Sequence, residues 1–185
     1  MLNTILGSLS SGVAASTNSY ESIATVTVGS GGAANVEFTS IPSTYTHLQI
    51  RAIFRNGNAT DTTFMRINSD TGSNYAWHTL RGNGSAVTAA GSSSQTNMEI
   101  PFATYSGTTA SVFTGLVADY LDYGNTNKYK TIRNLGGADL NGSGRIDFVS
   151  GLWQSTSAIT TIRFYPSSGN FVEYSQFALY GIKGS

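Results

Sequence analysis

The chain has 185 residues and no net charge, because ten Lys and Arg balance ten Asp and Glu. Charged residues make up only 11% of it, whereas a typical domain has about 25%. Phosphate backbones and anionic membrane surfaces attract clustered cations, so this composition argues against both as partners. Cysteine is absent, which excludes disulfides and cysteine zinc sites.

The first 19 residues differ from the rest and predict an assembly arm. They are rich in Ser, Gly and Ala, with apolar residues at Leu2, Ile5, Leu6 and Leu9. The first cation of the chain is Arg51, so the basic segment of a secretory signal is missing. We expect these four side chains to be buried against a neighbouring subunit.

From Tyr20 onward the sequence alternates with period two, which indicates β-strands. Residues 82–95, rich in Gly, Ser and Ala, predict a loop. About ten short strands are expected, over 23–28, 36–38, 47–55, 64–67, 74–81, 98–105, 112–121, 129–135, 145–153, 159–165 and 177–182. Short strands at this spacing predict one all-β domain over 20–185, a two-sheet, jelly-roll-like β-sandwich. The sequence has no run of about 18 apolar residues, so it predicts no membrane helix.

Catalytic patterns are weak. Only two histidines occur, His47 and His78, and no GxSxG-type nucleophile turn accompanies them. Asp119 and Asp122 offer paired acids, as in glycosidases, but they precede Gly124-Asn125 and are typical of turn residues. We therefore expect no enzymatic activity and no cofactor.

A calcium-loop pattern begins at Asp139 and continues through Asn141, Ser143 and Asp147, with Gly144 at its sixth position. The twelfth position, which should hold a bidentate Glu, is Ser150. The pattern favours a Gly-rich hairpin without a metal, and weak calcium binding is the alternative.

An aromatic cluster precedes the predicted loop: Tyr75, Trp77, His78 and Arg81. Trp, Tyr and Arg are typical of recognition surfaces, and sugars stack on Trp rings. These four residues are the candidates for contact with a glycan or a protein partner. Alternation offers another interpretation, with Trp77 in the core and His78 pointing outward. Trp153, in an apolar strand, is expected in the core.

The two ends of the domain carry a family resemblance. ITTIRFYPSSGNF (159–171), YSQFALYGIK (174–183) and the opening segment 20–51 resemble small jelly-roll virion proteins of tailed bacteriophages, many of them aquatic or cyanobacterial. The similarity covers roughly residues 20–183. It implies a virion component assembled in the host cytoplasm, and it transfers no catalytic residue.

Two roles follow from the resemblance. The first is a capsid decoration or cement protein, bound to the major capsid protein or other virion proteins. We expect a homotrimer for this role, because shells offer three-fold sites. The alternative is a tail-fibre or receptor-binding module that recognises host glycans. The short arm favours decoration, since receptor-binding tips usually follow a long shaft.

Overall fold

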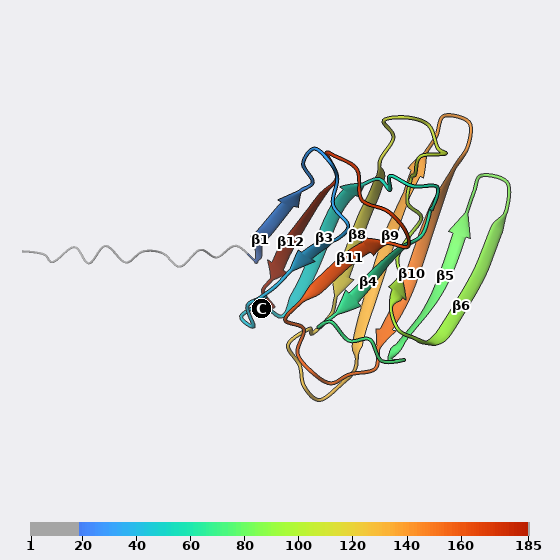
Figure 1. The fold of residues 1–185 in the computed structure, drawn as a ribbon. Helices are drawn as coiled ribbons and strands as arrows, with labels where there is room; N and C mark the ends of the chain where they lie inside the picture. The colour runs from blue at the N-terminus through green and yellow to red at the C-terminus, as the bar shows by residue number, and fades with distance from the viewer. Residues whose placement is uncertain (1–18, 185) are drawn as a thin grey trace, which may run out of the picture.

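The computed structural model describes residues 19–184, which form an all-β sandwich of two antiparallel sheets (Figure 1). The large sheet has eight strands, in the order β1 (Tyr20–Thr27), β12 (Gln176–Ile182), β3 (His47–Phe54), β8 (Thr114–Tyr120), β9 (Lys130–Asp139), β10 (Gly144–Trp153), β5 (Tyr75–Gly82) and β6 (Val87–Gln95). The small sheet has four, in the order β2 (Val36–Phe38), β11 (Ile162–Pro166), β4 (Thr63–Ile67) and β7 (Met98–Glu99). In this part of the chain no helix has the length and apolarity needed to cross a membrane.

Eight of the strands follow the connectivity of a jelly roll. β1, β12, β3 and β8 are neighbours in the large sheet, and β2, β11, β4 and β7 form the small one. Along the chain these strands alternate between the sheets, except that β4 and β7 lie in the same sheet. This order matches two interleaved Greek keys, so the predicted two-sheet sandwich is confirmed.

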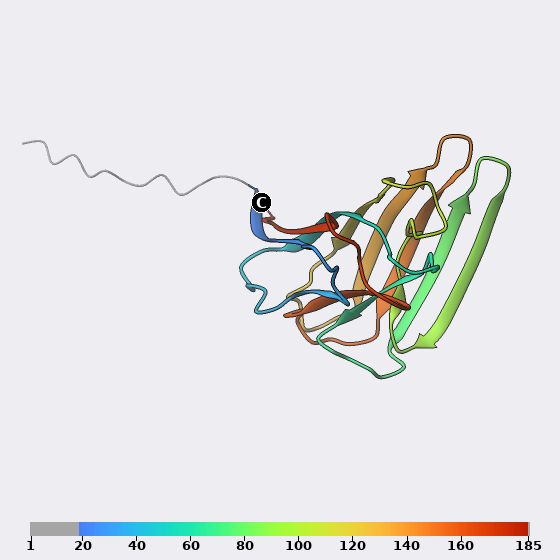
Figure 2. The same cartoon turned by 45° about the horizontal axis from the view of Figure 1, so that its top comes forward.

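The remaining four strands are two hairpins that widen the large sheet. β9 pairs with β8 and is joined by a short turn to β10, while β5 pairs with β10 and then with β6. Both hairpins extend past the small sheet (Figure 2). The large sheet is therefore much broader than the sheet that covers it.

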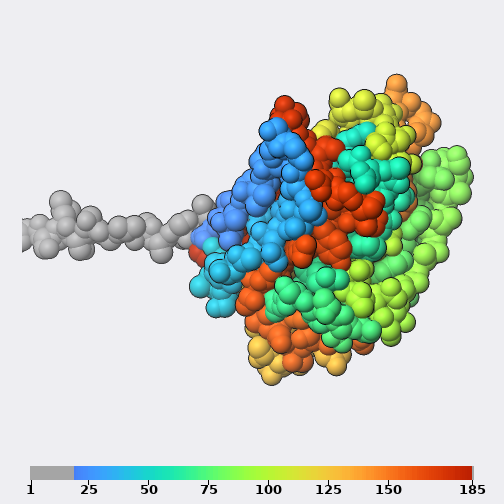
Figure 3. Space-filling view, in the orientation of Figure 1, coloured from blue at the N-terminus to red at the C-terminus, as the bar shows by residue number. Residues whose placement is uncertain are grey.

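The core lies between the two sheets and comes from inward-facing positions of both. Phe54, Phe164, Phe171 and Phe177 are fully buried and pack ring against ring, with centroids 5.1–5.8 Å apart. On the small-sheet side, segments from opposite ends of the chain lie side by side, since β2 pairs with β11 (Figure 3). The fold is thus closed by contacts between residues far apart in sequence.

Buried cations fix two of the loops. The Arg55 guanidinium donates to the carbonyl oxygens of Tyr105, Thr108, Thr109 and Val112 at 2.5–3.1 Å. The Lys130 ammonium donates to three carbonyl oxygens, those of Asn125, Lys128 and Thr156, at 2.6–3.1 Å. Burial lowers the pKa of Lys130, and the neighbouring charge of Lys128 lowers it further.

The secondary structure predicted for two segments was wrong. Residues 82–95 contain strand β6 rather than a single loop, although Ala, Gly and Ser have little intrinsic preference for strands. They become a strand because β5 supplies a hydrogen-bonding partner along almost the whole length. Residues 98–105 were predicted as a strand, but regular structure ends at Glu99 because the chain leaves the small sheet there.

Candidate functional site

The outer face of the large sheet, away from the core, carries exposed apolar side chains. Other outward positions of the same sheet are polar, as for Ser150 on β10 and Thr131 on β9. Here the exposed fraction runs from 39% for Val117 to 73% for Val87. The full set comprises Ile53, Leu80, Val87, Val117, Leu135, Ile146 and Phe148. We call these seven residues, with the glycines between them, the apolar face.

Strand register arranges these side chains in two rows across the sheet. In one row Val117, Leu135, Phe148 and Leu80 are direct neighbours on β8, β9, β10 and β5. In the other row, glycines lie between the bulky residues. That row reads Ile53, Gly115, Gly137, Ile146, Gly82 and Val87. Directly opposite residues share a face of the sheet, so both rows point outward.

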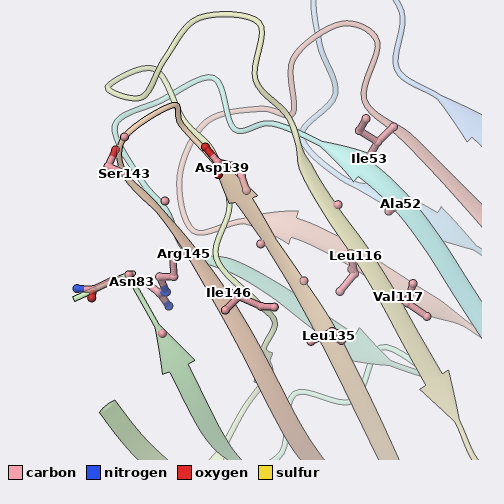
Figure 4. Close-up of a pocket in the computed structure, with 18 of the residues that line it drawn as sticks. Ala52, Ile53, Asn83, Leu116, Val117, Leu135, Asp139, Ser143, Arg145 and Ile146 are labelled. Atoms are coloured by element: carbon pink, nitrogen blue, oxygen red, sulfur yellow. The ribbon is translucent and has the colours of Figure 1, made fainter. Parts of the chain in front are cut away.

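The paired glycines create a trough. Gly115 and Gly137 lie opposite each other on adjacent strands, so two neighbouring outward positions have no side chain. Ile53 and Ile146 stand on either side, and the trough is open along its length, with a volume of about 1060 Å³ (Figure 4). The turns at 83–85 and 139–144 bound its upper end. Its lining combines the sheet backbone at the glycines with aliphatic side chains, and Arg51, Asp139 and Arg145 also contribute.

A polar row borders the apolar face. Gln49 donates to Asp119 at 2.8 Å, and Arg133 lies 3.6 Å from the same carboxylate. Tyr20 stacks on Tyr180 and donates to Gln49 at 2.6 Å. Burial raises the pKa of the Tyr20 hydroxyl. An apolar centre with a polar border is the usual anatomy of a protein interface.

An ionic cluster on the inward side of β10 holds the β9–β10 hairpin against the loop that follows β7. The buried Asp147 accepts from Arg145 Nη2 at 2.6 Å and from the Phe102 amide at 2.9 Å. Arg145 also reaches Asp61 at 3.3 Å. Burial raises the pKa of nearby Glu99, against the opposing charges of Arg81 and Arg145. These contacts of Asp147 hold the hairpin in place and are structural.

The predicted aromatic set is not a single surface. Tyr75 is completely buried, its hydroxyl contacts the backbone of Ile67, and burial raises its pKa to about 12. Trp77 packs against the core. Arg81 also belongs to the inward positions of β5, whereas His78 is exposed on the outer side. Alternation along β5 thus separates His78 from the other three.

The predicted calcium ligands do not converge. Asp139 accepts from the Asn141 amide at 2.7 Å within the hairpin turn, and Leu140 bonds to Ser143 across the turn. Asp147 lies inside, bound to Arg145. The segment is therefore the Gly-rich hairpin that the sequence favoured, and among residues 19–184 no cluster of acidic or histidine side chains could hold a metal ion.

The remaining candidate residues from the sequence are mostly engaged in structural contacts. Asp122 is bound to Lys128 and lies 3.4 Å from His47, and the hydrogen bond from Lys128 lowers the pKa of that carboxyl. Trp153 is in the core, with its indole nitrogen donating to Asp70 at 2.8 Å. Leu2, Ile5, Leu6 and Leu9 lie outside the described residues.

Sequence reasoning missed the apolar face. Its signal was present in 144–153, where Ile146 and Phe148 alternate with the charged Arg145 and Asp147, and in the Gly136-Gly137 pair inside a strand. No family model, curated protein or solved structure matches the chain.

Proposed function

We propose that this protein is a non-catalytic structural component of a tailed-phage virion, a capsid decoration or cement protein that assembles on the head through its apolar face. The observation that carries the proposal is the exposure of seven large apolar side chains on one side of one sheet. The largest apolar patch on a typical monomer covers about 300–600 Å². Seven half-exposed side chains of roughly 100 Å² each give roughly 700 Å², which exceeds that range.

The charge distribution supports the same role. The chain has no net charge, so no long-range field repels further copies or a neutral shell. A protein with this surface is prone to associate in free solution. Permanent residence in an assembly would cover the apolar face. The sequence resemblance to jelly-roll virion proteins suggests the virion as that assembly, with further copies of this chain and the major capsid protein as the partners.

The alternative role, a tail-fibre or receptor-binding module for host glycans, would need a new set of contacts. Tyr75 is buried and Trp77 faces the core, so neither ring is available for sugar stacking. Only His78 of the four candidates is exposed on the outer side. The geometry therefore favours the decoration role.

A particle-binding experiment tests the proposal. Phe148→Lys places a charge in the middle of the apolar face, and it should reduce co-sedimentation with undecorated heads at least tenfold. Tyr129→Lys is the matched control, since Tyr129 is 52% exposed but not part of the apolar face. Equal binding by both variants would contradict the proposal. Copy number in purified virions separates head from tail, with hundreds expected for a decoration protein.

A further inference from the structure

We infer that the apolar face is a two-fold self-association surface, in which the ridge of one copy fills the trough of a second copy. The ridge consists of Ile146 and Phe148 on β10 and Leu80 on β5. The inference rests on the proposed function, because it assigns a partner to the same face. It adds the identity of that partner, a second copy of this chain, and the symmetry of the contact.

The trough has the dimensions of the ridge side chains. Adjacent strands lie about 4.8 Å apart, so the backbones of β3 and β10, which flank the two glycine-bearing strands, are about 14 Å apart. A Phe or Ile side chain fits such a gap. The exposed backbone of Gly115 allows close approach, because nothing lies within 4 Å of where its Cβ would be.

Ridge and trough lie next to each other on a single face, and this position favours two-fold symmetry. In a two-fold contact the same patch is used by both copies, so a ridge residue of each meets a trough residue of the other. A two-fold axis that passes near Leu135 satisfies this condition. Leu135 is on β9, which lies between β8, the strand of Gly115, and β10, the strand of the ridge residues Ile146 and Phe148. The trimer expected from the sequence would use different patches on each copy, whereas here both parts of the contact share one face.

The available area matches what a stable dimer needs. A standard interface buries about 800 Å² per partner, and the apolar side chains alone supply roughly 700 Å². Charge does not oppose the contact. Arg51 lies over the Tyr20 and Tyr180 rings, at 5.4 and 5.9 Å, and Arg133 is paired with Asp119. Two sheet faces pack in this way in β-sandwiches, about 10 Å apart.

Filling the trough is the direct test. Gly115→Leu adds a side chain to free space in the protein's own fold, but occupies the volume needed by the partner's ridge. Gly29→Leu is the matched control, because Gly29 also has nothing near its Cβ position and lies in an exposed turn. Analytical ultracentrifugation at tens of micromolar should give a dimer of the 19.5 kDa chain for wild type and Gly29→Leu. Gly115→Leu should be a monomer with an unchanged circular dichroism spectrum.

Cross-linking provides a second test that does not depend on trough variants. The chain has no cysteine, so Leu135→Cys introduces a single thiol near the expected axis. A short bis-maleimide should link two copies of Leu135→Cys but not of Tyr174→Cys, which is exposed in a loop after β11. A monomeric or trimeric wild type, a dimeric Gly115→Leu, or equal cross-linking of both cysteine variants would overturn the inference.

The two proposals fail separately. If wild type is monomeric while Phe148→Lys still abolishes particle binding, the apolar face binds another virion protein and the dimer is wrong. If wild type dimerises through the trough while Phe148→Lys binds particles normally, the dimer stands and the proposed attachment is wrong.

Discussion

At the scale of single residues, Arg55 shows how a buried cation can organise a loop without a carboxylate. Its guanidinium makes five hydrogen bonds, four of them to carbonyl oxygens between Tyr105 and Val112 and one to the Thr108 hydroxyl. Its backbone amide also donates a hydrogen bond to the buried Ser175 hydroxyl at 3.2 Å. These bonds hold the long connection between β7 and β8 against the sandwich.

Replacing Arg55 with Met should therefore lower the free energy of unfolding by about 3 kcal/mol or more. The variant keeps much of the aliphatic volume but removes the charged donor from four partly buried carbonyl oxygens, and a hydrogen bond to a charged group contributes about 1.5–3 kcal/mol. Arg133→Met is the control, since the exposed pair with Asp119 should contribute only about 0–1 kcal/mol. Urea unfolding followed by fluorescence measures both. Equal stability of the two variants would show that the loop is held by other contacts.

At the scale of elements, β9 and β10 carry most of what is distinctive. Their turn has Asn141 and Gly142 at positive φ, +60° and +107°, conformations that Asn and Gly tolerate. On one side their hairpin presents Leu135, Ile146 and Phe148, and on the other it buries Asp147. The resemblance to a calcium loop thus reflects turn chemistry, because turns and calcium loops both use Asp, Asn and Gly.

Calcium should accordingly leave the stability of the hairpin unchanged. A ligand that binds only the native state stabilises it by about 2.7 kcal/mol at a hundred times Kd. Asp147 is already bound to Arg145, so it cannot join Asp139 at a metal without breaking that pair. We expect the melting temperatures in millimolar CaCl₂ and in EDTA to agree within about 1 °C by differential scanning fluorimetry. A shift of several degrees would show that the hairpin rearranges around the ion.

The elements also show what the sequence can predict. Strands such as His47–Phe54 and Gln176–Ile182 were predictable because one alternating set is apolar and packs in the core. Strand β6 was not, because its stability comes from pairing with β5 and not from its own residues. The trough was equally hidden, since it depends on Gly115 and Gly137 being opposite each other, and register between strands 22 residues apart is a property of the folded sheet.

At the scale of the whole molecule, the architecture separates stability from assembly. The core cluster draws on residues from Ile23 to Leu179, at inward positions of the jelly-roll strands and also of the added hairpins, such as Tyr75, Ile132 and Trp153. The apolar face lies mainly on the added hairpins and the outer side of β3 and β8. Substitutions on that face should thus change association while leaving the interior packing intact.

Deleting residues 1–18 tests whether the N-terminal segment belongs to assembly as well. Among the described residues, the core cluster is complete from Ile23 to Leu179, so we expect the melting temperature of the truncated protein to stay within a few degrees of wild type. If Leu2, Ile5, Leu6 and Leu9 are buried against a neighbour, each contributes about 1.5–3 kcal/mol to attachment, less the cost of ordering the backbone. Co-sedimentation with heads should then fall, and replacing only these four residues with Ser should reproduce the loss. Wild-type attachment by both variants would show that the N-terminal segment is not needed to hold the protein on the particle.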